Sequence, residues 1–343
     1  MKLHPLPEAE NFNNFSVLCM NDQGQFIKPG KNLENFKDAT AVGESQLSDF
    51  LERNIYLPDE VTDVFVWVHG WQNDYFSAIA SARKLFNGIC DVRDKGAGRY
   101  GGLSPFVPAF VVVHWPSKSS VLPGGYRKIR DRAAAMTEKG YAEFFLASLL
   151  GYLEKKNNRD AQAKVLKTAG GFYLHCLGHS FGGRFLTAAI CAAANPTPPK
   201  ILSNIKAQYP YTVDSLLVFQ MAAPDTAFAN NLTTLVEKAP LSGPMLLTHS
   251  RYDTANCKWH KQTEGECGIG CGGALEPADK IRALKLKELD ANYLAADFNS
   301  PIVNIDANDA YTDQKWFVGS HSDFFYEESI HLLLSLVNTI HGP

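Results

Sequence analysis

Short apolar runs alternate with longer stretches of helical periodicity along most of the chain. Two of the short runs, VFVWV and FVVV, are apolar without a break, as expected for strands buried on both faces of a sheet. The predicted strands are Asp63 to Val68, Ala109 to His114, Phe172 to Leu177, Leu216 to Met221 and Met245 to Thr248, with a further run at Ile302 to Ile305. Strands that alternate with crossover helices predict an α/β fold, with a mostly parallel central sheet and helices on both faces.

The longer stretches have the apolar spacing of amphipathic helices. The predicted helices are Phe76 to Cys90, Tyr126 to Glu154, Gly182 to Ala194, Thr226 to Glu237, Lys280 to Leu294 and Phe324 to Ile340. Residues 1–60 are predicted to form an N-terminal edge extension, with an antiparallel strand around Phe15 to Met20 and one short helix. Residues 61–343 are predicted to form one α/β domain, into which a Cys- and Gly-rich loop, Asn256 to Glu276, is inserted.

A GxSxG motif spans Gly178 to Gly182, with Ser180 at its centre. The run FYLHCL before the motif predicts a buried strand and RFLTAAICAAA after it predicts a helix, so Ser180 is expected on a sharp strand-to-helix turn. Such a turn holds the hydroxyl clear of the sheet, and the unpaired amides of the helix N-terminus face the position where an oxyanion would form. These features favour a nucleophilic serine over a merely structural glycine-rich turn.

The loop after the first predicted strand supplies a candidate for the second oxyanion donor. The strand Val64 to Val68 ends in His69, Gly70 and Trp71. Where a nucleophile lies on such a turn, one donor is the amide after it and the other lies in the loop after an earlier strand. Phe181 and Trp71 occupy these positions. His69 is expected to brace the loop, and the alternative is that the HG pair only ends the strand.

A general base is expected late in the chain, because the order of such sites is nucleophile, acid, histidine. His321 lies on a loop directly before the last predicted helix, whereas His331 lies within that helix and His341 lies near the end of the sequence. A loop position lets the imidazole reach over the edge of the sheet towards Ser180. His321 is therefore the predicted base, and His331 is expected to be a packed or solvated helix residue.

Two aspartates that follow predicted strands compete for the role of the acid. Asp253 follows the run MLLTHS, and Asp225 follows LLVFQMAAP one strand earlier. The carboxyl ends of parallel strands meet at one edge of the sheet, where ligands of open α/β folds bind. Asp253 is preferred because it is the later of the two, and Asp225, the alternative acid, would otherwise be a helix N-cap.

Composition and charge bear on whether the protein binds nucleic acid, spans a membrane or is secreted. The 343 residues carry a net charge of -3 without a basic stripe, so nucleic acid is not an expected partner. No apolar run reaches the roughly 20 residues that span a bilayer, and Met1 to Glu10 lacks the pattern of a secretory signal. A cytoplasmic location is predicted, with export that needs no N-terminal signal as the alternative, and the oligomeric state stays open.

Four candidate metal ligands crowd into the insert, namely Cys257, His260, Cys267 and Cys271. Cysteine and histidine are the usual zinc ligands, but this spacing equally fits a disulfide or free thiols. An odd total of 7 cysteines in a long chain favours free thiols over a disulfide framework. A structural zinc therefore stays one of three alternatives, and the insert is expected to be dispensable for chemistry at Ser180.

The motifs follow the order found in a known group of proteins. The chain resembles the α/β-hydrolase superfamily and, within it, a group of bacterial serine esterase or lipase-like hydrolases. The features of that group are strands ending VHG, WPS and AAPD, a helix with Tyr and Asp-Arg, GHSxG and a late histidine. Here they correspond to Val68 to Gly70, Trp115 to Ser117, Ala222 to Asp225, Tyr126 with Asp131 and Arg132, Gly178 to Gly182, and His321. Residues 1–60 and the insert have no counterpart in the group.

The resemblance implies an enzyme that cleaves a small-molecule or lipid ester through an acyl-enzyme, using a Ser-His-Asp triad and no cofactor. Two other functions stay open: a lipase or phospholipase-type toxin effector, and a catalytically inactive binding protein of the same fold. The lipase alternative rests on aromatic residues expected near the rim of the site, which are Trp71, Tyr75, Phe76, Phe324 and Phe325. Substrate specificity does not transfer with a fold.

Overall fold

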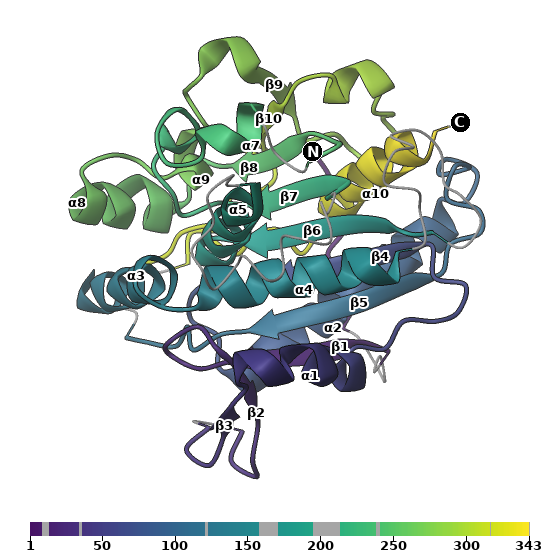
Figure 1. Ribbon diagram of the computed structural model, residues 1–343. Helices are drawn as coiled ribbons and strands as arrows, with labels where there is room; N and C mark the ends of the chain where they lie inside the picture. The colour runs from purple at the N-terminus through teal and green to yellow at the C-terminus, as the bar shows by residue number, and fades with distance from the viewer. Residues whose placement is uncertain are drawn as a thin grey trace.

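A ten-stranded sheet lies at the centre of the part of the chain that the structure describes, with the order β3-β2-β1-β5-β4-β6-β7-β8-β10-β9 (Figure 1). The computed structural model describes residues 1–8, 14–33, 36–120, 123–157, 171–194, 213–237, 241–315 and 317–342. The strands are β1 (Ser16–Met20), β2 (Phe26–Lys28), β3 (Thr40–Ala41), β4 (Asp63–Val68), β5 (Pro108–His114), β6 (Tyr173–His179), β7 (Ser215–Phe219), β8 (Met245–His249), β9 (Ile281–Lys285) and β10 (Ile302–Asp306). The predicted parallel sheet is confirmed, because every neighbouring pair from β1 across to β9 is parallel.

The N-terminal extension joins the sheet differently from the prediction. β1 pairs in parallel with β5, and the antiparallel pairing is with β2 on its other side. Leu18, Cys19 and Met20 are all buried, as expected for a strand that lies inside a sheet and is covered on both faces. The antiparallel edge is therefore formed by β2 and β3. The short helix predicted in this region is α1 (Leu47–Asn54).

Helices cover both faces of the sheet, as predicted, and each face has its own apolar core. Side chains alternate along β4: Val64 and Val66 pack with α1, α4 and α5 on one face, whereas Phe65 and Trp67 pack with α2 and α10 on the other. Figure 1 shows α4 and α5 in front of the sheet and α2 behind it. The helices are α2 (Tyr75–Lys95), α3 (Pro123–Glu138), α4 (Ala142–Lys156), α5 (Phe181–Ala194), α7 (Thr233–Glu237), α8 (Lys261–Glu264), α9 (Ile269–Gly272) and α10 (Glu327–His341). None of the described helices is long and apolar enough to cross a membrane.

Two of the predicted helices are each divided in the structure. The stretch from Tyr126 to Glu154 forms α3 and α4, with a break at Gly140, where an added Cβ would lie 2.5 Å from the carbonyl oxygen of Gln23. The β1–β2 turn therefore packs where a continuous helix would pass. The stretch from Thr226 to Glu237 forms a 3₁₀ turn and then α7.

The prediction of a helix from Lys280 to Leu294 is wrong. Residues 281–285 form β9, which pairs in parallel with β10 at the edge of the sheet. The run IRALKLK alternates apolar and polar residues in its second half, and this period of two fits a half-buried strand. Pairing with β10 outweighs the helix propensity of Ala, Leu and Lys.

The insert is folded, and not an irregular loop. A π-helical segment (Ala255–His260) leads into α8, and a turn then leads into α9. Backbone hydrogen bonds tie it to neighbouring strands: Gly270 N–H donates to Met221 O at 3.0 Å, and Ser250 N–H donates to Gly270 O at 3.0 Å. The insert is therefore packed against the carboxyl ends of β7 and β8.

A disulfide joins Cys257 to Cys271 across the insert. Cys267 is a free thiol, and His260 Nδ1 lies 2.9 Å from the carbonyl oxygen of Glu266. Zinc binds thiolates, and a disulfide removes two of them. Of the three alternatives, the structure has the disulfide for this pair, and a zinc site of all four residues does not fit a chain in which that disulfide is formed.

Candidate active site

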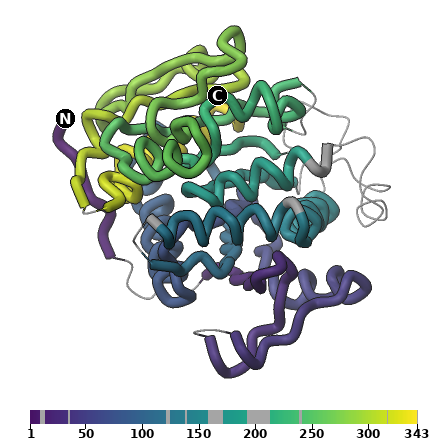
Figure 2. The backbone as a smooth tube through the Cα atoms, turned by 90° about the vertical axis from the view of Figure 1, so that its left-hand side faces the viewer, coloured from purple at the N-terminus to yellow at the C-terminus, as the bar shows by residue number. Residues whose placement is uncertain are grey.

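Ser180 lies on the turn between β6 and α5, at the carboxyl ends of the parallel strands. Figure 2 is viewed from this side. Its φ of 55° lies in the left-handed region, which side-chain-bearing residues rarely adopt. The glycines of the motif permit the tight turn. A Cβ on Gly178 would lie 2.6 Å from Cα of Gly183, and a Cβ on Gly182 would lie 2.1 Å from the carbonyl oxygen of Val68. Larger side chains at these positions would push the turn out of place.

Ser180, His321 and Asp253 form one chain of hydrogen bonds. Ser180 Oγ lies 2.8 Å from His321 Nε2, and His321 Nδ1 lies 2.9 and 3.0 Å from the two carboxylate oxygens of Asp253. Ser180 and Asp253 are fully buried and His321 is 3% exposed. With its proton on Nδ1, the imidazole donates to Asp253 and keeps Nε2 free to accept the proton of the serine hydroxyl. The carboxylate within reach of His321 is that of Asp253.

The Asp253 carboxylate is held by two side-chain amides. Asn256 donates to Oδ1 through its backbone N–H at 3.0 Å and to Oδ2 through Nδ2 at 2.7 Å. Gln220 Nε2 donates to the same Oδ2 at 3.1 Å and to the carbonyl oxygen of Ser320 at 2.9 Å. Hydrogen bonds to an ionised carboxylate are among the stronger ones in proteins. Since Asn256 belongs to the insert, the insert contributes two of the hydrogen bonds to the Asp253 carboxylate.

The loop after β4 passes directly beside Ser180. A Cβ on Gly70 would lie 2.9 Å from Ser180 Cβ, so only glycine fits there. The next residue is Trp71, and Phe181 is the first residue of α5. Within the described residues, the backbone N–H of Trp71 and that of Phe181 have no protein acceptor. Two unpaired amides therefore flank the serine, at the positions predicted for oxyanion donors.

Three neutral imidazoles brace these loops. His69 Nε2 lies 2.9 Å from His114 Nδ1, and the indole N–H of Trp115 donates to the carbonyl oxygen of His69 at 2.7 Å. Burial lowers the pKa of His69 to about 4 and that of His114 well below its usual value. His179 Nε2 lies 2.5 Å from the carbonyl oxygen of His321, and burial lowers its pKa too. His69 therefore has the bracing role predicted for it, and His179 fixes the loop that carries His321.

Tyr126 lies against both predicted oxyanion residues. Its ring centroid lies 5.4 Å from that of Trp71 and 5.6 Å from that of Phe181. The hydroxyl is buried and has no hydrogen-bond partner among the described residues. Burial, with the negative charges of Glu264 and Asp253, raises the pKa of Tyr126 well above its usual value. The phenol is therefore a protonated donor with no acceptor, and such a group in a native protein calls for an explanation.

Asp225, the alternative acid, is not part of the hydrogen-bonded chain. Its carboxyl group pairs with that of Glu266, and burial together with this contact raises the pKa of Asp225. The predicted helix-cap role is also wrong. The N-cap of the 3₁₀ turn Ala227–Ala229 is Thr226, and it makes no side-chain capping bond.

The two other late histidines lie away from Ser180. His331 is buried in α10, where its Nδ1 lies 2.7 Å from the hydroxyl of Tyr100, so the prediction of a packed helix residue is confirmed. His341 Nε2 lies 2.7 Å from Asp63 Oδ1 at the opposite end of the sheet. The predicted site residues Ser180, His321, Asp253, Trp71 and Phe181 converge at the carboxyl ends of the strands.

Three side chains of this site are not among the residues predicted from the sequence. Gln220 directly follows β7, so the rule that polar residues at strand ends meet at one edge could have found it. Asn256 lies three residues after Asp253, within one helical turn, and was absorbed into the predicted loop. Tyr126 appeared only as part of a family motif. Its unpaired hydroxyl is a property of the packed structure, which residue spacing does not reveal.

Comparison of the chain with protein-family models, with curated proteins and with solved structures finds no match.

Proposed function

We propose that the protein is a serine hydrolase of the α/β-hydrolase fold that cleaves a carboxylic ester through an acyl-enzyme. The observation that carries the proposal is the 2.8 Å contact between Ser180 Oγ and His321 Nε2, made on a turn with a φ of 55°. A serine hydroxyl is a weak nucleophile, and a base within hydrogen-bond reach activates it. The central position of β6 in a parallel sheet supports the proposed fold.

In the proposed mechanism, Ser180 Oγ attacks the ester carbonyl carbon while its proton moves to His321 Nε2. The Asp253 carboxylate stabilises the imidazolium that forms, and the amides of Trp71 and Phe181 donate to the developing oxyanion. Collapse of the tetrahedral intermediate returns the proton to the departing alcohol and leaves an acyl-serine. Water then attacks this acyl group with His321 again as the base, which restores the free hydroxyl.

The unpaired hydroxyl of Tyr126 finds an acceptor in this scheme. Because its ring packs against the side chains of Trp71 and Phe181, we infer that the phenol can donate to a substrate oxygen bound by the backbone amides of these two residues. Donation to that oxygen would satisfy a group that has no protein partner. We assign Tyr126 the role of a substrate-binding donor.

Two alternative functions receive less support. Of the aromatic residues behind the lipase alternative, Trp71 and Phe324 are core residues and only Phe76, at 58%, is largely exposed. An inactive binding protein has no need for an acid held by three amide donors or for two unpaired amides beside a serine. A soluble ester is therefore the preferred substrate class.

The test is hydrolysis of p-nitrophenyl esters of graded acyl length, with matched amide and thioester substrates and with the Ser180→Ala variant as control. We expect turnover of at least one ester by the wild-type chain and none above background by the variant. Absence of turnover across the panel, or equal turnover by the variant, would contradict it.

A further inference from the structure

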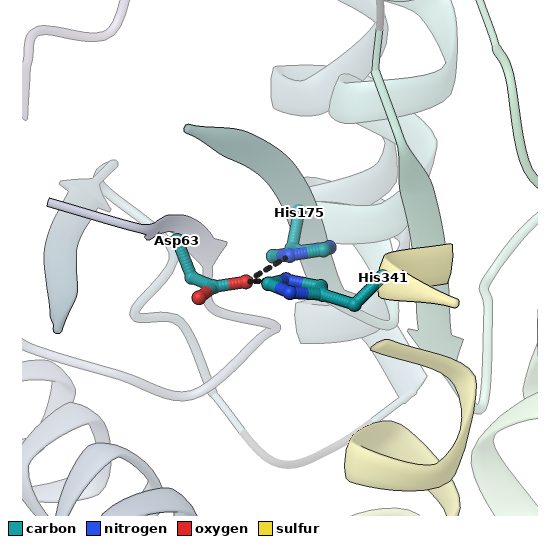
Figure 3. Close-up of side chains that lie close together, drawn as sticks. All are labelled: Asp63, His175 and His341. Carbon is teal, nitrogen blue, oxygen red and sulfur yellow. Dashed lines mark hydrogen bonds and ion pairs between the residues drawn. The ribbon is translucent and has the colours of Figure 1, made fainter. Parts of the chain in front are cut away.

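Three chemistry-bearing side chains, Asp63, His175 and His341, lie close together (Figure 3). They lie towards the amino ends of the parallel strands, whereas Ser180 lies at the carboxyl ends. Asp63 is the first residue of β4, His175 lies in β6, and His341 is the last residue of α10. Nε2 of His175 lies 3.0 Å from Asp63 Oδ1, and Nε2 of His341 lies 2.7 Å from the same oxygen. The three atoms all lie within 4.8 Å of one another. Each residue therefore offers one donor atom to a common point.

Neighbouring groups hold these side chains in orientation. The hydroxyl of Thr62 donates to Asp63 Oδ2 at 2.6 Å, and His175 Nδ1 lies 2.8 Å from Ser215 Oγ. The ring of His341 lies against that of Tyr173, with 4.1 Å between centroids. Metal-binding imidazoles almost always have their second nitrogen held by such a partner, and binding carboxylates are themselves hydrogen-bonded. His175 and Asp63 have this support.

The cluster contains a buried negative charge. The side chains of Asp63 and His175 are fully buried and that of His341 is 3% exposed. In the described part of the chain, the ion pairs of Asp63 are with these histidines and not with a lysine or arginine. A buried carboxylate needs a cation beside it.

We propose that Asp63, His175 and His341 bind one divalent transition-metal ion through Oδ1 and the two Nε2 atoms. Ligand atoms at about 2.0–2.2 Å from one ion lie roughly 3 to 3.5 Å apart, so the 2.7 and 3.0 Å separations need to open by less than about 1 Å. Two imidazoles and one carboxylate suit Zn²⁺ or Fe²⁺, whereas Mg²⁺ and Ca²⁺ prefer oxygen ligands alone. Binding requires both Nε2 atoms to be free of protons, and the ion then becomes the positive charge beside Asp63.

The bound ion would join β4, β6 and α10. α10 follows the loop that carries His321, so the site would anchor a helix that starts close to the candidate active site. Because metal affinity for a site that exists only in the folded chain is also folding free energy, the ion would stabilise the protein. This inference does not depend on the proposed esterase activity.

The test uses the full chain, purified without a histidine tag and stripped with a chelator, and titrated with Zn²⁺. We expect about one equivalent bound per chain, a thermal midpoint that rises with Zn²⁺, and loss of that rise when chelator is added. Co²⁺ in place of Zn²⁺ should give a spectrum of nitrogen and oxygen ligation without thiolate charge transfer. Absence of tight binding, or a thiolate spectrum, would overturn the proposal.

Matched variants locate the ion. His341→Gln should weaken Zn²⁺ binding by about 100-fold or more, because it removes a ligand, and Ser215→Ala should weaken it about 10-fold through His175. His331→Gln, which changes another buried imidazole of α10, should leave the affinity unchanged, and so should Cys267→Ser in the insert. Asp63→Asn provides a second ligand change if His341→Gln does not fold. Unchanged affinity in the ligand variants, or affinity lost only in Cys267→Ser, would contradict the assignment.

Discussion

Two hydrogen-bonded Ser–His–Asp triplets lie at opposite ends of the strands of the same sheet. At the carboxyl ends of the strands His321 joins Ser180 to Asp253, with distances of 2.8 and 2.9 Å. At the amino ends His175 joins Ser215 to Asp63, with distances of 2.8 and 3.0 Å. All six side chains are buried. Hydrogen-bond lengths and burial therefore do not distinguish a candidate nucleophile from a structural serine.

The backbone around each serine makes the difference. Ser180 has a φ of 55° on a turn before α5, beside the unpaired amides of Trp71 and Phe181. Ser215 is the first residue of β7 and the direct cross-strand partner of His175, so its hydroxyl contacts the imidazole as an ordinary neighbour in a sheet. A serine in a regular strand has no helix N-terminus to stabilise an oxyanion. The turn and its amides, more than the hydrogen-bonded triplet, favour Ser180 as the candidate nucleophile.

The largest expected effect separates the two serines. Ser180→Ala should lower ester turnover by a factor on the order of 10⁴ or more, because nucleophile and base act as a unit. Ser215→Ala should keep most of the turnover. Steady-state kinetics on one p-nitrophenyl ester measures both, with circular dichroism to verify folding. Similar losses of turnover in the two variants would remove the distinction between the two triplets.

The second largest expected effect is a difference in turnover between variants of the two aspartates, Asp253 and Asp63. Asp253→Asn offers His321 the wrong hydrogen-bond partner, and turnover should fall by about three to four orders of magnitude with little change in folding. Asp63→Asn should keep the turnover but lower the free energy of unfolding by about 1–3 kcal/mol, since a buried charge-assisted contact is lost. Kinetics and urea denaturation of both variants give the comparison. A turnover loss in Asp63→Asn that matches the loss in Asp253→Asn would contradict it.

Tyr126 sharpens the comparison because its hydroxyl is unpaired in the free protein. Tyr126→Phe should lower kcat/KM about 10-fold, as for loss of one donor to substrate, and should leave the free energy of unfolding unchanged or raised. The matched control is Tyr100→Phe, whose hydroxyl contacts His331 at 2.7 Å. That variant should lose about 1 kcal/mol of stability and keep its kcat/KM. Lost stability with unchanged kcat/KM in Tyr126→Phe would show that the Tyr126 hydroxyl has a structural role and does not bind substrate.

The smallest effect concerns the insert. Asn256→Ala removes the 2.7 Å hydrogen bond to Asp253 Oδ2, and we expect turnover to fall a few-fold to about 10-fold. Asn304→Ala is the control, because Asn304 binds the backbone of Ala274 at the end of the insert and has no hydrogen bond to the acid. It should lower the thermal midpoint without changing kcat. An unchanged kcat in Asn256→Ala would return the insert to a purely structural role.

Residues that follow a short motif or end a strand could be predicted from the sequence. Ser180 has the GxSxG context, and His321 and Asp253 follow from chain order and from the common edge of parallel strands. Trp71 follows from the end of β4. Each of these inferences needs only the local pattern and the direction of the strands.

Contacts between distant segments could not be predicted. Asp63 meets a histidine 112 residues away and another 278 residues away, and nothing in the spacing links them. The Cys257–Cys271 disulfide could not be told from a metal site, because both need only cysteines that fold together. The sequence predicts a helix where the structure has β9, because the pairing of β9 with β10 is a tertiary interaction that local propensity does not report.

The most direct measurement is labelling of the wild-type chain with a fluorophosphonate, followed by intact mass spectrometry and peptide mapping. This reagent forms a stable bond with a serine that a neighbouring base activates. We expect one adduct per chain, located on Ser180, with Ser215 unmodified and with labelling abolished in both Ser180→Ala and His321→Ala. An unlabelled wild-type chain, or an adduct on any other serine, would contradict the assignment of Ser180 as the nucleophile.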